Sequence, residues 1–356
     1  MAKRPTSIKQ VANAAGVSTA TVSNVFSGKK PVKPELAAKV RETAKRLGYH
    51  VNRAASNLRS GQSRIVPVMV PDLSDPFFTS LITEIEALAE ADDFDIIVAS
   101  SKDDAETEKR RIAALLSWQP AGMIIVPSSD AVPQALIAAR DSMPIILTDR
   151  GVGAEGFDVV LPDNLEAGRQ AGAHLAELGH RHVLIAASDL GLQAIQDRCD
   201  GVTEQIEAAG GTTDVLAVGP KPAIGAAHLG EWLDANPMPS AVFATTDMTT
   251  LSLLSCLAER GIDVGSDVSV VGFDDYPWMS ARRTPITAVR QPVEGMAEAI
   301  WATLKSRLTG LEPESATANL KCTLLIRAST RPVQDARHEP LNGTAGTREA
   351  QQRASG

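Results

Sequence analysis

The spacing of hydrophobic residues changes at about residue 64 of the chain. Before this point, apolar positions recur at helical spacing in three short runs between residues 8 and 47. From residue 65 onward, short runs rich in Val and Ile alternate with amphipathic stretches. This pattern predicts buried parallel strands joined by helices, and so a doubly wound α/β sheet. The strand candidates are RIVPVMVPD, DIIVASS, GMIIVPSS, MPIILTDR, HVLIAASD, AVFATTD and VSVVGFDD.

Capping residues set the limits of the three short helices. Ser7 and Gln10 fit a capping box before the first helix, and Gly16 ends it. The second helix is expected over residues 19–26 and the third over residues 34–47, from a proline to a glycine. Three short helices with a glycine in the first turn predict an all-α helix-turn-helix domain. The side chains expected on the inner face of the second helix are Val22, Val25 and Phe26.

The second helix of a helix-turn-helix enters the DNA major groove, and its first turns contact base edges. Thr19, Ala20 and Asn24 are therefore the candidate base readers. Asn pairs bidentately with adenine, and the methyl groups of Ala and Thr fit the thymine methyl. Ser18 is expected both to contact DNA and to cap the helix. The full set of candidate phosphate contacts is Ser18, Thr21, Ser23, Lys29 and Lys30.

Charge is divided unevenly between the two regions. Residues 1–64 hold thirteen Lys or Arg against only Glu35 and Glu42, a formal charge near +11, whereas the whole chain carries −8. A basic N-terminal module joined to an acidic body indicates a polyanionic partner such as DNA. The alternative is a solvated basic arm without a partner.

Residues 7–63 resemble the DNA-binding headpiece of the lactose-repressor (LacI/GalR) family of bacterial transcription regulators. The pattern VAxxAGVSxxTVSxV, followed by LGY and NRxAxxLRxG, carries the resemblance. It implies that residues 52–61 form a hinge helix on operator DNA and that Leu58 enters the minor groove, although a plain linker is the alternative. Two residues depart from the family pattern. Val51 stands where the family usually has proline, and Asn24 stands where its best-known members carry arginine. The residues expected around the wedge are Asn52, Ala55 and Arg59.

Polar residues close several predicted strands, at the edge where open α/β sheets bind ligands. Carboxylates, guanidinium groups and an amide together satisfy the vicinal hydroxyls of a sugar, because each hydroxyl both donates and accepts. Phe78 or Trp278 is expected to cover an apolar ring face. For any single Asp, the alternative is a cap on the following helix. The pocket candidates are Asp75, Asp149, Arg150, Arg198, Asp247, Asp274, Asp275 and Gln291.

The stretch from residue 65 to residue 331 is similar to the family's effector domain and to the periplasmic sugar-binding proteins. The resemblance implies two lobes, with the chain crossing between them near residues 163, 288 and 320. Thr246 stands where the family commonly has Asn, so the site loses an amide. The residues that the resemblance places at the effector site are Asp149, Arg150, Arg198, Asp274 and Gln291.

These patterns divide the chain into four segments. We expect a helix-turn-helix domain over residues 1–50, a hinge over 51–64, a two-lobed effector-binding and dimerisation domain over 65–331, and a disordered tail over 332–356. The tail lacks the apolar heptads of a tetramerising coiled coil. A homodimer on palindromic operator DNA is therefore expected.

The sequence predicts a repressor controlled by a small molecule, with a sugar or sugar derivative as the expected effector. A purine corepressor is the alternative. A sugar-binding subunit of an importer fits the body alone, but the basic headpiece and the lack of a signal segment speak against it. Three widely spaced cysteines and no apolar run long enough to cross a bilayer predict a cytoplasmic protein.

An enzyme is not expected. The sequence has no Gly-rich phosphate loop and no nucleophile elbow, and we expect no cofactor. His174, His180 and His182 lie between a predicted helix and a strand without a carboxylate or cysteine at ligand spacing. They are interpreted as helix-end residues, and no metal is expected.

Overall fold

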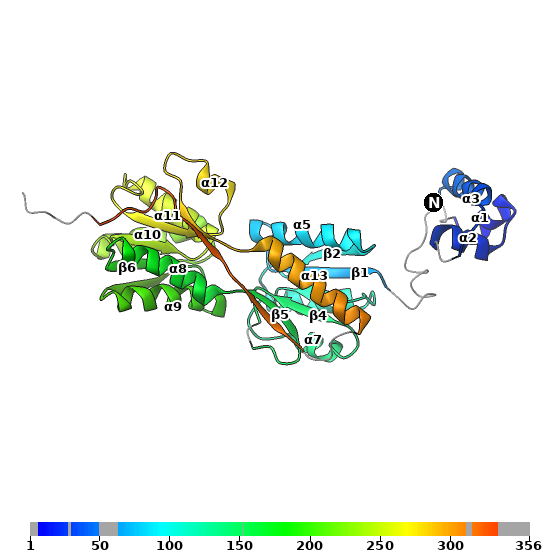
Figure 1. The fold of residues 1–356 in the computed structure, drawn as a ribbon, viewed down its shortest axis with the longest axis horizontal. Coiled ribbons are helices and arrows are strands. Elements are labelled where there is room, and N and C mark those ends of the chain that lie inside the picture. Colours follow the sequence, from blue (N-terminus) through cyan, green and yellow to red (C-terminus); the bar gives the residue numbers. More distant parts are fainter. Residues whose placement is uncertain (1–5, 28–29, 50–62, 152, 311–314, 334–356) are drawn as a thin grey trace, which may run out of the picture.

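The N-terminal helices pack as a small bundle with its own core. The computed structural model describes residues 6–27, 30–49, 63–151, 153–310 and 315–333. The capping box of Ser7 and Gln10 is confirmed, and Gly16 ends the first helix with a φ of 70°. Val11, Val22 and Val40, one from each helix, meet in the core. The helices are α1 (Ile8–Ala15), α2 (Thr19–Ser27) and α3 (Pro34–Leu47) (Figure 1).

The second helix buries two of the three side chains expected inside. Val22 and Val25 are buried, whereas Phe26 is 36% exposed, so its prediction as an inner residue was wrong. Its ring lies against Tyr49, with centroids 5.8 Å apart. Because Phe26 directly follows Val25, it lies about 100° further round the helix and reaches only the rim of the core.

The body consists of two α/β lobes with the same sheet order. The first sheet has the order β11-β5-β4-β3-β1-β2 and all its paired strands are parallel. Helices cover both faces, as expected for a doubly wound sheet (Figure 1). The elements of this lobe are β1 (Ile65–Val70), α5 (Pro76–Ala91), β2 (Asp95–Ser100), α6 (Ala105–Leu116), β3 (Met123–Ile125), α7 (Gln134–Ala139), β4 (Ile145–Thr148), β5 (Asp158–Pro162), α13 (Val293–Thr309) and β11 (Thr317–Leu320).

The second lobe repeats this arrangement in the order β12-β10-β9-β8-β6-β7. Its one difference in direction is the edge strand β12, which runs antiparallel to β10. Its elements are α8 (Asn164–Glu177), β6 (His182–Ala187), α9 (Gln193–Ala208), β7 (Thr212–Ala217), α10 (Pro222–Ala235), β8 (Ala241–Ala244), α11 (Asp247–Glu259), β9 (Ser269–Phe273), α12 (Pro277–Ser280), β10 (Thr287–Arg290) and β12 (Thr323–Leu325).

The chain passes between the lobes at three places. It crosses between β5 and α8, between β10 and α13, and between β11 and β12, where a long ribbon runs diagonally across Figure 1. These crossings lie at residues 163, 291–292 and 321–322. The first is where the sequence predicts it, and the other two lie a few residues further along.

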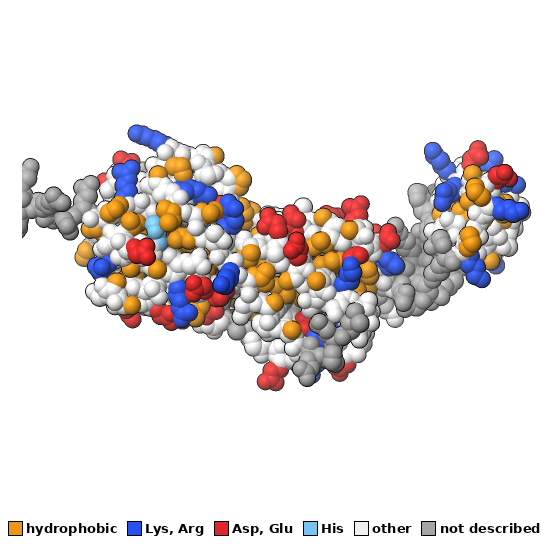
Figure 2. Space-filling view, in the orientation of Figure 1, with side chains coloured by type: hydrophobic (Ala, Val, Ile, Leu, Met, Phe, Trp, Pro, Cys, Tyr) orange, Lys and Arg blue, Asp and Glu red, His pale blue; other side chains and the backbone are white. Residues whose placement is uncertain are grey.

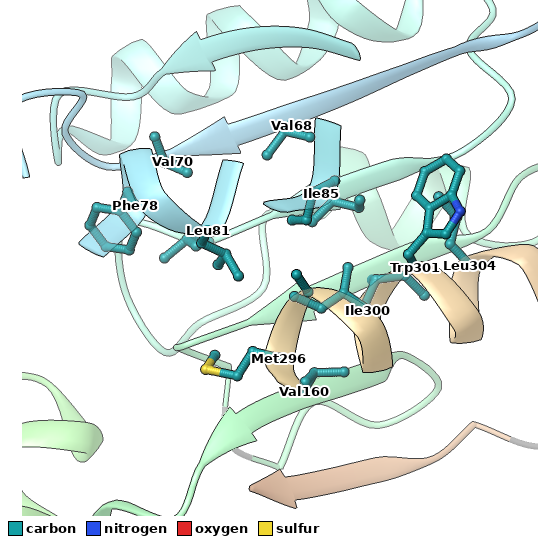
Figure 3. Packing of buried hydrophobic residues seen from close by; sticks show 14 of the residues in the cluster. Val68, Val70, Phe78, Leu81, Ile85, Val160, Met296, Ile300, Trp301 and Leu304 are labelled. Carbon is teal, nitrogen blue, oxygen red and sulfur yellow. The ribbon is translucent and has the colours of Figure 1, made fainter. Parts of the chain in front are cut away.

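Each lobe is held by its own buried core. In the first lobe, α5 and α13 pack side by side over one face of the sheet, where Phe78, Leu81 and Ile85 of α5 share a core with Met296 and Ile300 of α13 (Figure 3). Phe78 belongs to this core as well as to the cleft side of α5. All seven strands predicted from apolar runs are present, but β5, β7, β10, β11 and β12 were not predicted.

Two buried histidines tie the end of the described chain to the second lobe. His174 is hydrogen-bonded through Nε2 to the Thr330 hydroxyl at 2.9 Å. His180 bonds through Nε2 to the Arg331 carbonyl at 3.1 Å and through Nδ1 to Ser240 at 2.9 Å. Burial lowers the pKa of both rings. They are neutral structural groups near the end of α8, which agrees with their interpretation as helix-end residues.

The free energy of unfolding is expected to rise between about pH 5.5 and 7. The pKa of each ring is lower in the folded state than its ordinary value near 6.5, so the unfolded state binds more protons in this range. Urea titrations at several pH values measure the slope. Replacing His180 by Gln should flatten it. Equal slopes in the wild type and the variant would contradict this assignment.

Candidate functional site

The first turns of α2 present the predicted base readers to solvent. Thr19 and Ala20 are exposed, and Asn24 is half-buried. The Ser18 hydroxyl accepts a hydrogen bond from the Thr21 amide at 3.0 Å, so Ser18 caps α2 as expected. Figure 2 shows Lys and Arg side chains distributed around this small domain. Among the described residues, α2 therefore offers short polar side chains on a basic module.

Several predicted DNA contacts lie outside the described residues. These residues are Lys29, Asn52, Ala55, Leu58 and Arg59.

A cavity of about 400 Å³ lies between the two lobes. It forms at the carboxyl ends of the strands of both sheets, which is where ligands bind open α/β sheets. Apolar surface comes from Phe77, Phe78, Leu192, Ile195 and Met248. The polar lining residues include Asp72, Asp75, Lys102, Asp103, Asp149, Arg150, Ser188, Asp189, Arg198, Lys221, Thr246, Asp247, Asp274 and Gln291.

Asp149 and Asp274 occupy equivalent positions in the two lobes. Asp149 follows β4 and Asp274 follows β9, strands that hold the same place in their sheets. Both have a left-handed backbone, with φ of 62° and 64°. Each amide donates to the next strand, Asp149 to Val160 at 3.2 Å and Asp274 to Val289 at 2.9 Å. A left-handed non-Gly residue costs about 1–3 kcal/mol, and such strain is typical of ligand sites.

Four aspartates at the cavity oppose one another's ionisation. Burial raises the pKa of Asp75 to about 8, and the charges of Asp274 and Asp247 contribute to the rise. Burial, followed by the charge of Asp274, raises the pKa of Asp247 to about 6. Burial also raises the pKa values of Asp149 and Asp274 against the opposing effect of nearby arginines. Hydrogen-bond donors from a ligand would relieve this cost.

Arg150 is fixed by its own lobe. Its Nη1 donates to the Asp103 carboxylate at 2.6 Å and to the carbonyls of Pro127 and Ser128 at 3.2 and 2.9 Å. The same loop is held from the other side, because the Glu108 carboxylate accepts from the Ser128 amide and hydroxyl at 2.7 and 2.9 Å. Arg150 thus joins the cavity wall to the loop that follows β3.

Arg198 has the corresponding role in the second lobe. Its Nε donates to Asn164 Oδ1 at 2.8 Å and its Nη1 to the Thr245 carbonyl at 2.7 Å. The guanidinium lies 3.7 Å from the centroid of the Phe273 ring. Glycines let α8 and α9 approach closely enough for these contacts. A Cβ on Gly168 would lie 2.3 Å from the Arg198 carbonyl oxygen.

Gln291 and Thr246 complete the second-lobe wall. The Gln291 amide donates to Asp274 Oδ1 at 2.6 Å. Its Oε1 is buried and has no hydrogen-bond partner among the described residues, so it can accept from a ligand. The Thr246 hydroxyl instead caps α11, where it accepts from the Thr249 amide at 3.1 Å. The residue that replaces the usual Asn therefore uses its hydroxyl within the fold.

The structure brings nine of the eleven predicted effector residues to the cavity. Trp278 of α12 is one exception, because it packs against the core of the second lobe. Asp275 also turns away and pairs with Arg290 and Arg327, each at 2.6 Å. The geometry places both outside the cavity, and the binding roles of the nine remain predictions. The nine are Asp75, Phe78, Asp149, Arg150, Arg198, Thr246, Asp247, Asp274 and Gln291.

Several lining residues were not predicted. Lys102 and Asp103 follow β2, Asp189 follows β6 and Lys221 follows β7. The same strand-end argument that selects Asp149 would have found the first three, since they close strands visible in the sequence. Lys221 could not be found that way, because its strand, TTDVLA, begins with three polar residues, has no buried residue and was not predicted.

Metal and membrane sites receive no support from the described part of the chain. No group of three or more His, Cys, Asp or Glu side chains is placed to hold a metal ion within it. None of its helices combines the length and apolar character needed to span a bilayer.

Comparison with known proteins identifies the family. Residues 7–52 match the model of bacterial regulatory proteins of the lacI family, and residues 173–330 match a periplasmic binding protein-like domain. The HTH-type transcriptional regulator CelR of Thermobifida fusca is 32% identical over 340 residues, spanning 92% of this chain and 98% of CelR. This chain belongs to the lacI family. PtxS of Pseudomonas putida is 30% identical and spans 91% of this chain and 96% of PtxS.

Solved structures show the same fold as this lacI-family regulator. The Lac repressor dimer bound to operator and an anti-inducer has a TM-score of 0.81 at 23% identity, covering 92% of this chain and 100% of that one. A CelR–cellobiose complex has a TM-score of 0.69 at 30% identity, with the same coverage. Since the relatives are named transcriptional regulators, the chain is a regulator and not an enzyme.

Asp75→Asn is expected to raise the melting temperature at pH 8 by about 2–4 °C, which is roughly 1 kcal/mol for a unit of this size. The pKa of Asp75 in the folded state lies above its ordinary value of 3.8, so ionisation increasingly opposes folding as pH rises from about 4 to about 8. Asn keeps an oxygen to accept from the Phe77 amide, which Asp75 caps at 2.8 Å.

The measurement is a thermal melt of wild type and variant at pH 5 and pH 8, where the gain should be clearly smaller at pH 5. Asp104→Asn is the matched control, because Asp104 caps α6 from an exposed position and its pKa is lowered. An equal gain for Asp75→Asn at both pH values would show that charge burial is not its cause.

Proposed function

We propose that this regulator is a repressor that binds a palindromic operator as a homodimer and responds to a neutral polyhydroxylated effector, such as a sugar, held between its lobes. The observation that carries the proposal is the composition of the cavity wall. Buried acceptors from both lobes converge on one space, and each lobe supplies one anchored arginine.

The charge of the wall favours an uncharged ligand with many donors. Seven aspartates and four Lys or Arg line the cavity, so a carboxylate or phosphate on the effector would meet net repulsion. Sugar hydroxyls donate to carboxylates and to the free Gln291 Oε1, and they accept from arginine. Phe78 supplies an apolar surface for a ring face.

The relative CelR supports the ligand class. CelR is 32% identical to this chain, and a solved CelR structure holds cellobiose. A nucleobase or nucleoside is the second candidate, because the Phe78 ring offers a stacking surface. The surplus of carboxylates disfavours a nucleotide, whose phosphates carry negative charge.

The headpiece supports operator binding. In a helix-turn-helix of this kind, α2 enters the major groove, so Thr19, Ala20 and Asn24 are proposed to contact bases. Leu58, in the hinge expected from the family resemblance, is proposed as a minor-groove wedge. Short readers provide modest direct readout, and DNA deformability is proposed to supply part of the specificity.

A thermal-shift screen is expected to find the effector among neutral sugars and polyols, with cellobiose included. A ligand that binds only the folded state adds about 2.7 kcal/mol at a hundred times its Kd. Sugar acids and nucleosides form two further arms of the panel. A hit among nucleosides would favour the second candidate, whereas a hit among sugar acids would contradict the charge argument.

Asn24→Ala is expected to relax base preference at one operator position, costing about 1–3 kcal/mol on the preferred base. Binding selection from a randomised palindrome measures this preference for wild type and variant. Lys30→Ala is the control, because an exposed lysine that contacts phosphate should weaken all sequences equally and reduce the salt dependence. An equal loss for Asn24→Ala on every sequence would make Asn24 a backbone contact.

A further inference from the structure

Helix α9 begins in the second lobe without a side-chain cap of its own. Its N-cap residue is Leu192, which has no side-chain acceptor, and its first turn carries no acidic residue. The first amides of a helix need acceptors, which are usually supplied by a neighbouring Ser, Thr, Asp or Asn. This helix carries Ala194, Ile195 and Arg198 into the effector cavity, so the position of its first turn affects the site.

The missing acceptor comes from the opposite lobe. Asp130 lies in the loop between β3 and α7, and its Oδ2 accepts from the Gln193 amide at 2.9 Å. Its other oxygen, Oδ1, accepts from the Gly151 amide at 3.3 Å. One carboxylate thus joins the start of α9 to the segment after β4 in the first lobe.

The Asp130 loop is held in place and is connected to the cavity. Arg150 donates to the carbonyls of Pro127 and Ser128, and Glu108 holds Ser128 from behind. A ligand that contacts Arg150 therefore acts on a group that also fixes this loop. The connection runs from one cavity arginine through Asp130 to the helix that bears the other, Arg198.

We propose that Asp130 is a positioning residue of the effector site that caps α9 across the lobe interface and stabilises this arrangement of the lobes. The cap forms only when the loop after β3 lies against the start of α9. When the lobes rotate apart, the bond from Asp130 to the Gln193 amide is lost. The bond is therefore present in one lobe arrangement and absent in the other. The regulatory meaning of the bond rests on the proposed function, but its effect on lobe geometry does not.

The Gln193 position allows a clean test. Gln193 is the first residue of α9, where proline is tolerated because its fixed φ suits a helix start. Leu192 before it has an extended backbone, φ −100° and ψ 127°, which also suits proline. Gln193→Pro therefore removes the donor while the helix is kept. Gln193→Ala removes the side chain, which bonds to Asp197, and keeps the donor.

The experiment measures the distance between the lobes in the full-length protein without effector or DNA. Spin labels on cysteines introduced at exposed Lys109 of α6 and Glu207 of α9 report this distance in protein diluted with unlabelled chains. The native cysteines Cys199, Cys256 and Cys322 are buried, so the introduced thiols take the label.

Asp130→Ala and Gln193→Pro should each lower the population of this lobe arrangement, relative to arrangements with the lobes further apart, about five-fold. This is the effect expected from the loss of one helix cap. The double variant should match the single variants, because both remove the same bond. Asp130→Asn, which keeps an acceptor oxygen, should restore most of the ratio. Gln193→Ala and Asp104→Ala, the latter removing a cap within the first lobe, should leave it unchanged.

Distance distributions unchanged in both Asp130→Ala and Gln193→Pro would overturn the proposal, as would additive effects in the double variant. The test is independent of the ligand screen. If no sugar binds but the lobe distances shift as expected, the proposed effector class fails and the cap across the interface stands.

Discussion

The burial of like charges where two sheets meet is the constraint on which this structure depends. Asp149 and Asp274 each sit in a left-handed turn at a strand end, and their pKa values are raised by burial. Buried carboxylates persist only where charges or donors compensate them. Arg198 provides such compensation, and its own guanidinium is in turn fixed by Asn164 and the Thr245 carbonyl. The close packing of α8 on α9 at Gly168 can be understood as a requirement of this arginine's position.

The shared order of strands explains why the cavity has matching walls. The two lobes have the same strand order. A polar residue that follows one strand in the first lobe therefore lies at the same place along the carboxyl edge as the residue that follows the corresponding strand in the second lobe. Facing the two edges toward each other brings Asp149 and Asp274 to one space. The lobes differ in the residue that comes directly after each of these aspartates. Arg150 in the first lobe turns back to hold its own loop, whereas Asp275 in the second is paired with Arg290 and Arg327. Symmetry of the fold therefore supplies the acceptors, and local sequence decides which neighbours reach the ligand.

The sequence predicts the central strands and most of the cavity because both depend on local pattern. Continuous apolar runs identify β1 or β6, and a polar residue at the end of such a run must lie at the ligand edge. Strands at or near the sheet edges escape this reasoning, since β7 has no buried residue and β11 is mostly exposed. The place of Trp278 was also beyond local pattern, because its ring could face the cavity or the lobe core and only tertiary packing decides. Asp130 was missed for a related reason. An Asp before a short helix predicts a cap for that helix, and nothing local shows that it caps a helix more than sixty residues away.

The balance between repulsion and capping gives the lobes a physical basis for a switch. Without a ligand, burial raises the pKa of Asp75, and the Asp274 and Asp247 charges of the opposite lobe contribute to the rise, so bringing the lobes together has an electrostatic cost. The bond from Asp130 to the Gln193 amide opposes that cost, and it is worth only about 1 kcal/mol, as a typical cap is. The electrostatic cost and the cap therefore act in opposite directions on the equilibrium between lobe arrangements. A ligand that donates hydrogen bonds to the carboxylates favours the closed arrangement alone, and a difference of about 1–3 kcal/mol between the two arrangements is the usual size of allosteric coupling. A cavity that is costly to close when empty is therefore well suited to a protein that must respond to the ligand that fills it.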